Sequence, residues 1–88
     1  MTSLYTAVIK PEFGTYRLKL SHFYKVLGIA ADSYGKIVIT YLQDPASDDK
    51  EVIFYVFDVS NIIPPKLRYL GTVSPNMGQL FHVFVQEH

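Results

Sequence analysis

Residues 51–59 read Glu-Val-Ile-Phe-Tyr-Val-Phe-Asp-Val, and this stretch decides the fold. Successive side chains of an extended strand point to opposite sides. The apolar residues of one side are Val52, Phe54 and Val56, and those of the other are Ile53, Tyr55, Phe57 and Val59. β-Branched and aromatic residues on both sides are typical of a central strand that is covered on both faces. We therefore expect a neighbouring strand at each edge, and a layer above and below that comes from this chain or from a second copy.

The rest of the chain consists of short extended segments separated by turn residues. The further strands that we expect are residues 3–9, 15–20, 23–31, 36–43, 67–73 and 79–86. In the second of them Thr15, Arg17 and Lys19 alternate with apolar residues, which predicts an edge strand with one wet face. Apolar residues nowhere keep a helical spacing over three turns. The sequence predicts an all-β domain over residues 1–88, a small antiparallel sandwich or flattened barrel of about six to seven strands.

Residues 60–65, Ser-Asn-Ile-Ile-Pro-Pro, interrupt the strands. Asn61 can cap one short helical turn near residues 60–63, which the two prolines prevent from growing. We expect this segment to cross from one sheet to the other, with Ile62 and Ile63 tucked beneath it.

The composition argues against several classes of partner. Eight basic and eight acidic side chains cancel, so no net field attracts the chain to nucleic acid or to an anionic membrane. The chain has no cysteine, which fits a cytosolic location without proving it. No secretory signal precedes the first strand, and the longest uncharged window contains Pro75 and two glycines. We expect a soluble intracellular protein with no membrane partner.

The sequence offers no catalytic or metal motif. Ser21 and His22 are adjacent, and neighbours on an extended chain point to opposite sides, so they do not form a nucleophile and its base. The histidines and carboxylates lack the spacing of a zinc site. His82 lies in an apolar strand, where the simplest interpretation is a core histidine satisfied by one or two hydrogen bonds and the alternative is a ligand contact. We expect no enzymatic activity, no metal and no cofactor.

Two kinds of binding site remain open. Basic and aromatic residues interleave at 16–19, 23–25 and 66–69, a mixture that on an open β face binds single-stranded nucleic acid, although zero net charge makes nucleic acid an unlikely partner. Alternatively, Gly28, Ala30 and Gly71 remove bulk from strands. The simplest interpretation is that they let the strands bend or pack closely, and the other is that they leave room on which Arg68, Tyr69, Thr72 and His82 converge around a nucleotide-like anion. The candidate ligand- or partner-binding residues are Arg17, Lys19, Arg68, Tyr69, Thr72 and His82.

Residues 69–73, Tyr-Leu-Gly-Thr-Val, are followed by a short loop and by Phe-His-Val-Phe at 81–84. This passage resembles the closing signature of a small uncharacterised family of proteins encoded mainly by bacteriophages, in which an aromatic, an aliphatic and Gly-Thr-Val precede an aromatic-His-Val-Phe ending. The order of the upstream strands is also similar. This chain has Phe81 where the family pattern has tryptophan. The resemblance implies a phage accessory protein in the cytoplasm of the bacterial host cell, aimed at host machinery or host defence.

The leading hypothesis is a non-enzymatic phage protein that binds a host or host-defence protein and acts as a homo-oligomer. The alternative is a sponge for a small signalling nucleotide, with a pocket around Arg68, Thr72 and His82. Single-stranded nucleic-acid binding is the third hypothesis.

Overall fold

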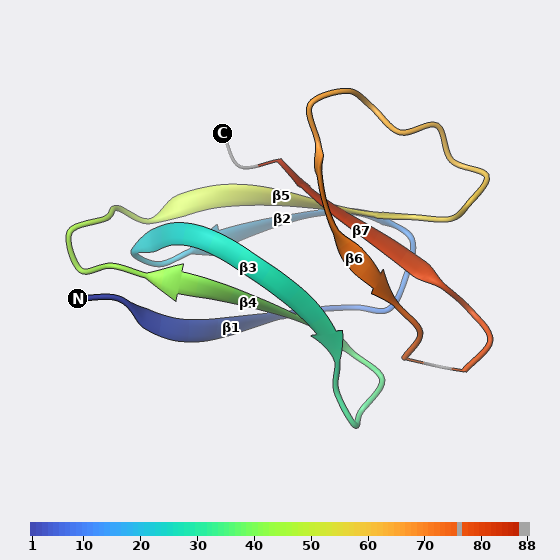
Figure 1. Ribbon diagram of the computed structural model, residues 1–88, viewed down its shortest axis with the longest axis horizontal. Coiled ribbons are helices and arrows are strands. Elements are labelled where there is room, and N and C mark those ends of the chain that lie inside the picture. Colours follow the sequence, from blue (N-terminus) through green and yellow to red (C-terminus); the bar gives the residue numbers. More distant parts are fainter. Residues whose placement is uncertain (76, 87–88) are drawn as a thin grey trace.

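The computed structural model describes residues 1–75 and 77–86 and is shown in Figure 1. The chain forms seven strands, which are β1 (Ser3–Ile9), β2 (Gly14–Leu20), β3 (Phe23–Ala31), β4 (Ile37–Gln43), β5 (Lys50–Phe57), β6 (Arg68–Val73) and β7 (Phe81–Gln86). The predicted all-β class is confirmed. β1 and β3 have the predicted bounds, β5 differs by one residue at its start and two at its end, and each of the other strands differs by one or two residues at one end.

The strands form two antiparallel sheets. One has three strands in the order β1-β4-β3 and the other has four in the order β2-β5-β7-β6. They stack as an open sandwich rather than a closed barrel, with the edge strands β3 and β6 in contact with each other. In Figure 1, β3, β4 and β1 lie below β5 and β2, and β6 and β7 run diagonally across the right-hand side. The molecule is thin, with Cα extents of 40 × 32 × 16 Å, as expected for two layers about 10 Å apart.

The core lies between the two sheets and draws on strands of both. Its buried side chains from the three-stranded sheet are Ile9, Phe23, Val26, Ile37, Ile39 and Tyr41, and those from the four-stranded sheet are Leu20, Val52, Phe54, Val56, Phe81, Val83 and Val85. No polar or charged side chain is buried with them among the described residues. The alternation of each strand therefore sends one apolar side into a dry interface.

β5 is the inner strand that the sequence predicts, with β2 paired along one edge and β7 along the other. Only one of its two apolar sides is enclosed by this chain. Val52, Phe54 and Val56 face the core, whereas Tyr55 and Phe57 are half-buried on the outer face of the sheet. A two-layer fold supplies only one opposing sheet, so the described residues do not form the second expected layer.

The connection between β5 and β6 differs from the prediction. Both strands belong to the four-stranded sheet and flank β7, so residues 58–67 pass from one side of β7 to the other and do not cross between sheets. Ile62 is 93% exposed instead of tucked under the segment. The expected helical turn near residues 60–63 is also wrong. Asn61 Oδ1 accepts a hydrogen bond from Asp58 N at 2.6 Å, and Asn61 N donates to the Asp58 carbonyl at 3.1 Å, so a side-chain-closed turn satisfies these groups without a helix.

Candidate ligand-binding site

The outer face of the four-stranded sheet carries a continuous group of aromatic rings. Cross-strand pairing places Tyr69 and Tyr55 on either side of Phe84. The Tyr69 and Phe84 ring centroids are 5.2 Å apart, and Phe57 lies 5.6 Å from Phe84 and 5.8 Å from Tyr55. These separations are in the range of favourable aromatic pairs. The rings form one apolar surface, which we call the aromatic face.

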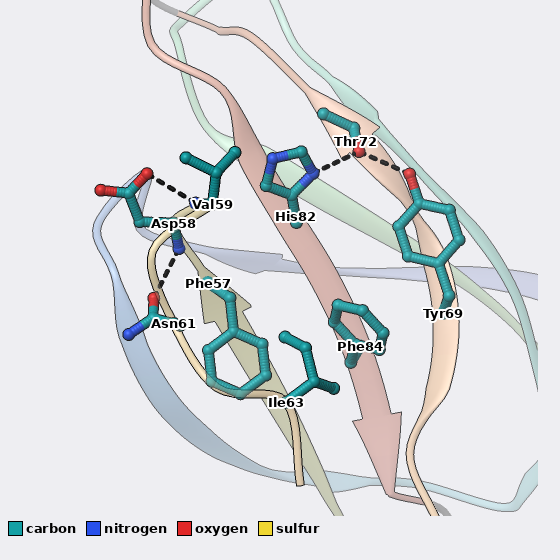
Figure 2. Close-up of a pocket in the computed structure, with 9 residues that line it drawn as sticks. All are labelled: Phe57, Asp58, Val59, Asn61, Ile63, Tyr69, Thr72, His82 and Phe84. Atoms are coloured by element: carbon teal, nitrogen blue, oxygen red, sulfur yellow. Dashed lines mark hydrogen bonds between the residues drawn. The ribbon is translucent and has the colours of Figure 1, made fainter. Parts of the chain in front are cut away.

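The turn after β5 folds over one end of the aromatic face and leaves a pocket of about 340 Å³ beneath it. This volume is at the lower end of the range for small-molecule sites, about 300 to 1,000 Å³. Figure 2 shows the turn on one side of β7 and the hydroxyl-bearing strand β6 on the other. The lining residues are Phe57, Asp58, Val59, Asn61, Ile63, Tyr69, Thr72, His82 and Phe84.

A short chain of hydrogen bonds crosses from β6 to β7 at the wall of the pocket. Thr72 and His82 are cross-strand partners, and Thr72 Oγ1 lies 2.7 Å from His82 Nδ1 and 2.5 Å from the Tyr69 hydroxyl. His82 Nε2 is buried and has no hydrogen-bond partner. Leaving a polar atom buried and unpaired costs about 1–3 kcal/mol. The site therefore has one nitrogen whose hydrogen-bonding capacity is unused.

The pocket is apolar on most of its walls and has an acidic rim. Asp58 carries the only carboxyl group among the described lining residues. Asp58 Oδ1 accepts a hydrogen bond from Val59 N at 2.6 Å, which holds the carboxylate at the turn. No Lys or Arg lines the pocket in the described part of the chain, so a bound phosphate would meet a carboxylate and no cation.

Three of the predicted site residues meet in this pocket, namely Tyr69, Thr72 and His82. Arg68 does not. Its Nη2 donates to the Val26 carbonyl at 2.9 Å, so this guanidinium ties β6 to β3 on the side of the sheet away from the pocket. The anion-binding group that the nucleotide hypothesis requires is therefore absent from the lining.

Arg17 and Lys19 lie on β2, which β5 and β7 separate from β6 in the sheet. Arg17 Nη1 is 3.2 Å from Glu51 Oε1, and both side chains are about 60% exposed. The neighbouring ring, Tyr16, points to the opposite face and donates a hydrogen bond to the Glu12 carbonyl at 2.7 Å. Burial is the main cause that raises the pKa of Tyr16, and the Glu12 carboxylate adds to it. Rings and cations thus separate to the two faces of β2 and do not form a stacking platform there.

The interpretation of His82 as a core residue is wrong. Phe81, Val83 and Val85 occupy the core side of β7, so His82 falls on the outer face with Phe84. Sequence reasoning also missed Phe57, Phe84 and the turn 58–63 as pocket walls. The available signal was the second apolar side of β5 and β7, which the core does not use.

The small residues fit the simpler of the two interpretations, in which they let strands bend or pack closely, and none of them lines the pocket. Gly28 lies at a register shift of β3 and has open space around its missing side chain. A Cβ on Gly71 would lie 3.4 Å from Ile29, so this glycine permits close contact between β6 and β3. The pocket comes from the turn that overhangs the aromatic face and not from missing bulk in the strands.

Within the described residues no group of three or more His, Asp or Glu side chains is arranged to hold a metal ion. The same residues include no helix long and apolar enough to cross a membrane.

A model of the family described as "Domain of unknown function (DUF7352)" matches residues 5–88. No curated protein and no solved structure matches the chain.

Proposed function

The chain belongs to the DUF7352 family, and we propose that it is a non-enzymatic binding protein that acts as a homo-oligomer. The family description names no activity, so the support comes from the surfaces of the molecule. The observation that carries the proposal is the edge strand β1, with the apolar face beside it.

β1 lacks the features that protect a sheet edge from pairing with another chain. Exposed edges usually carry charges, prolines or bulges. β2 has Arg17 and Lys19, and β3 and β6 each have a register shift. β1 reads Ser-Leu-Tyr-Thr-Ala-Val-Ile, pairs with β4 in unbroken register, and has no strand on its other side in the described part of the chain.

The outer side of β1 and β4 beside this edge carries leucine, threonine and valine side chains and no charge, and the charge nearest to it on this face is Lys25 of β3, opposite Leu42. Leu4 and Val8 are 65% and 52% exposed and pair with Leu42 and Val38 of β4. An uncharged edge that continues into an uncharged face fits a second copy of the same strand, because antiparallel pairing joins identical segments about a two-fold axis. A register centred on Thr6 places Leu4 of one copy opposite Val8 of the other. The three-stranded sheets of two copies then form one continuous sheet.

Light scattering coupled to size exclusion tests the assembly. We expect the wild-type chain to be a dimer at micromolar concentration. The double variant Leu4→Lys, Val8→Lys places like charges opposite each other and should be a monomer. Leu4→Glu, Val8→Glu should behave the same way, and an equimolar mixture of the two variants should restore the dimer.

Two controls separate this pairing from other contacts. Leu27→Lys adds the same charge at a 46% exposed leucine of β3 and should leave the dimer intact. Val38→Lys changes the apolar face but not the edge and should also leave it intact. A monomeric wild type, or a dimer lost in Val38→Lys and kept in the β1 variants, contradicts edge pairing.

The aromatic face supports a protein as the second partner. Aromatic residues are enriched and charged residues depleted at the centres of protein interfaces, and Tyr55, Phe57 and Phe84 meet that description. The resemblance to a phage-encoded family makes a host or host-defence protein the partner class that we expect. The double variant Tyr55→Ser, Phe84→Ser should no longer bind a purified candidate partner that the wild type binds, and the control variant Leu27→Lys should still bind it. Equal binding by all three proteins contradicts this assignment.

The alternative hypothesis is that the chain sequesters a small signalling nucleotide. Of the residues predicted for that site, Tyr69, Thr72 and His82 line the pocket and Arg68 does not, and no other Lys or Arg of the described residues lines it. Isothermal titration with cyclic and linear nucleotides tests this hypothesis. The absence of heat at high micromolar ligand would contradict nucleotide binding. Single-stranded nucleic-acid binding requires a steep loss of affinity with added salt, and we do not expect it.

A further inference from the structure

We propose that the pocket beside His82 binds a small, uncharged, planar heteroaromatic molecule, of the size of an indole or a nucleobase, which hydrogen-bonds to His82 Nε2. This inference goes beyond the proposed function, because it concerns a free small ligand and not a protein partner or a second copy.

The walls define the shape of the ligand. Phe57, Phe84 and Tyr69 contribute ring surfaces from three different strands, and Ile63 closes the pocket from the turn (Figure 2). Ring surfaces stack favourably with a flat π-system. With about 340 Å³ of space, the pocket suits one or two fused rings and is too small for a dinucleotide.

His82 defines the polar group of the ligand. Nδ1 is engaged by Thr72 Oγ1, which itself contacts the Tyr69 hydroxyl, so the imidazole is held in one orientation. Nε2 is then the ring nitrogen left for a ligand, and it is buried without a partner. The Thr72 hydroxyl can either donate to Nδ1 or accept from it, so the imidazole proton can lie on either ring nitrogen. Nε2 is therefore able to donate to a ligand or to accept from it. A ring nitrogen or carbonyl of a heteroaromatic compound supplies the matching group.

The turn gives this nitrogen a cover that is easily displaced. In Figure 2 the Nε2 side of the imidazole faces Val59, on the side of the ring opposite Thr72. Val59 is 79% exposed, so its side chain makes few contacts that would be lost if it moved. A ligand that enters the pocket between Val59 and the imidazole would satisfy Nε2 and bury its own apolar surface.

The charges define what the ligand lacks. Asp58 stands at the rim, no Lys or Arg lines the pocket among the described residues, and Arg68 reaches the Val26 carbonyl instead. An anionic group near the rim is repelled by the carboxylate and gains no compensating ion pair. The site therefore favours a nucleoside or free base over the corresponding nucleotide, which reverses the preference that the sequence suggests.

The test is a titration of the full chain, followed through the imidazole nitrogens by two-bond proton–nitrogen NMR. The probes are indole, benzimidazole, and the four ribonucleosides with their 5′-monophosphates. We expect at least one uncharged probe to shift His82 Nε2 with a dissociation constant on the order of 1 mM or tighter, and its monophosphate to bind no more tightly. His22 Nδ1 donates to the Ser47 carbonyl at 3.0 Å, far along the chain from the pocket, and serves as the internal control.

His82→Phe keeps a ring in place and removes Nε2, so it should weaken binding of the active probe at least about tenfold. His22→Phe is the matched control and should bind like the wild type. If His82→Phe does not fold, the wild-type Nε2 shift decides the question alone. The proposal is overturned if no uncharged probe shifts His82, or if monophosphates bind more tightly than nucleosides. A monomeric protein would leave this test unaffected, so the two proposals fail separately.

Discussion

The substitution Phe54→Ala tests whether the core lies on one side of β5. The Phe54 side chain is fully buried, between the cross-strand neighbours Tyr16 on β2 and Val85 on β7. Emptying such a site costs about 3–5 kcal/mol in free energy of unfolding. An 88-residue domain has a total stability of about 4–13 kcal/mol. The variant should therefore lose a quarter of its stability or more.

Phe57→Ala is the matched substitution on the opposite side of the same strand. Phe57 is half-buried and contacts Tyr55 and Phe84, so we expect a loss of about 1–2 kcal/mol from partial burial and aromatic contacts. Urea unfolding measures both variants, and an unchanged m-value shows that the change is in stability and not in the denatured state. If Phe54→Ala does not fold, Phe54→Leu should still lose more than Phe57→Leu.

Equal losses at the two positions, or a loss below about 1 kcal/mol at Phe54, would refute the one-sided core. A further result is informative in its own right. If the loss at Phe57 grows with protein concentration, a second copy covers the aromatic face, because an interface adds stability by mass action.

Three further outcomes follow from single contacts. Because burial raises the pKa of Tyr16, the stability contributed by its neutral phenol is fully present below the unfolded pKa of about 10 and is lost as pH rises through the folded pKa. Tyr16→Phe should therefore flatten the fall in urea midpoint above pH 10 relative to the wild type. Arg17→Gln removes the ion pair with Glu51, and since both side chains are about 60% exposed, thermal unfolding should show a change below about 1 kcal/mol. Gly71→Ala meets a β3 side chain at 3.4 Å with φ at +154° and should cost about 1–3 kcal/mol by urea unfolding, whereas Gly28→Ala, in open space, should cost less.

The strands could be predicted because period-two patterns and turn residues are local signals. β1 and β3 have the predicted bounds, and Tyr16 and Arg17 alternate on β2 as expected. The sheet order is not local. The partner of β6 is β7, which comes later in the chain, so nothing in residues 58–67 shows that they pass around a strand of their own sheet.

The candidate site was only partly predictable for a related reason. The sequence predicts that Tyr69, Thr72 and His82 converge because small residues leave space beside them, and it is instead the pairing of β6 with β7 that brings them together. Arg68 precedes Tyr69 directly in the sequence, so the alternation of a strand sends it to the other side, where it reaches β3. The chemistry of a pocket on a sheet depends on whether a residue occupies an odd or an even position along its strand, because successive side chains point to opposite faces. A one-residue difference decides whether a cation lines it.

The two apolar sides of β5 and β7 also explain why surface and core were hard to distinguish. Phe54 and Phe57 have the same chemistry, and only the position of the second sheet makes one the centre of the core and the other part of an exposed aromatic face. A contiguous apolar patch on a protein surface often marks a binding site, and three of the four rings of the aromatic face are half-buried while Tyr69 is 55% exposed. β1 belongs to the three-stranded sheet, so pairing there extends that sheet and leaves the aromatic face and its pocket open. Self-association through β1 therefore does not account for Tyr55, Phe57, Tyr69 and Phe84. The proposed assembly through β1 and the proposed ligand site beside His82 therefore concern different surfaces of the chain, and each can be tested without the other.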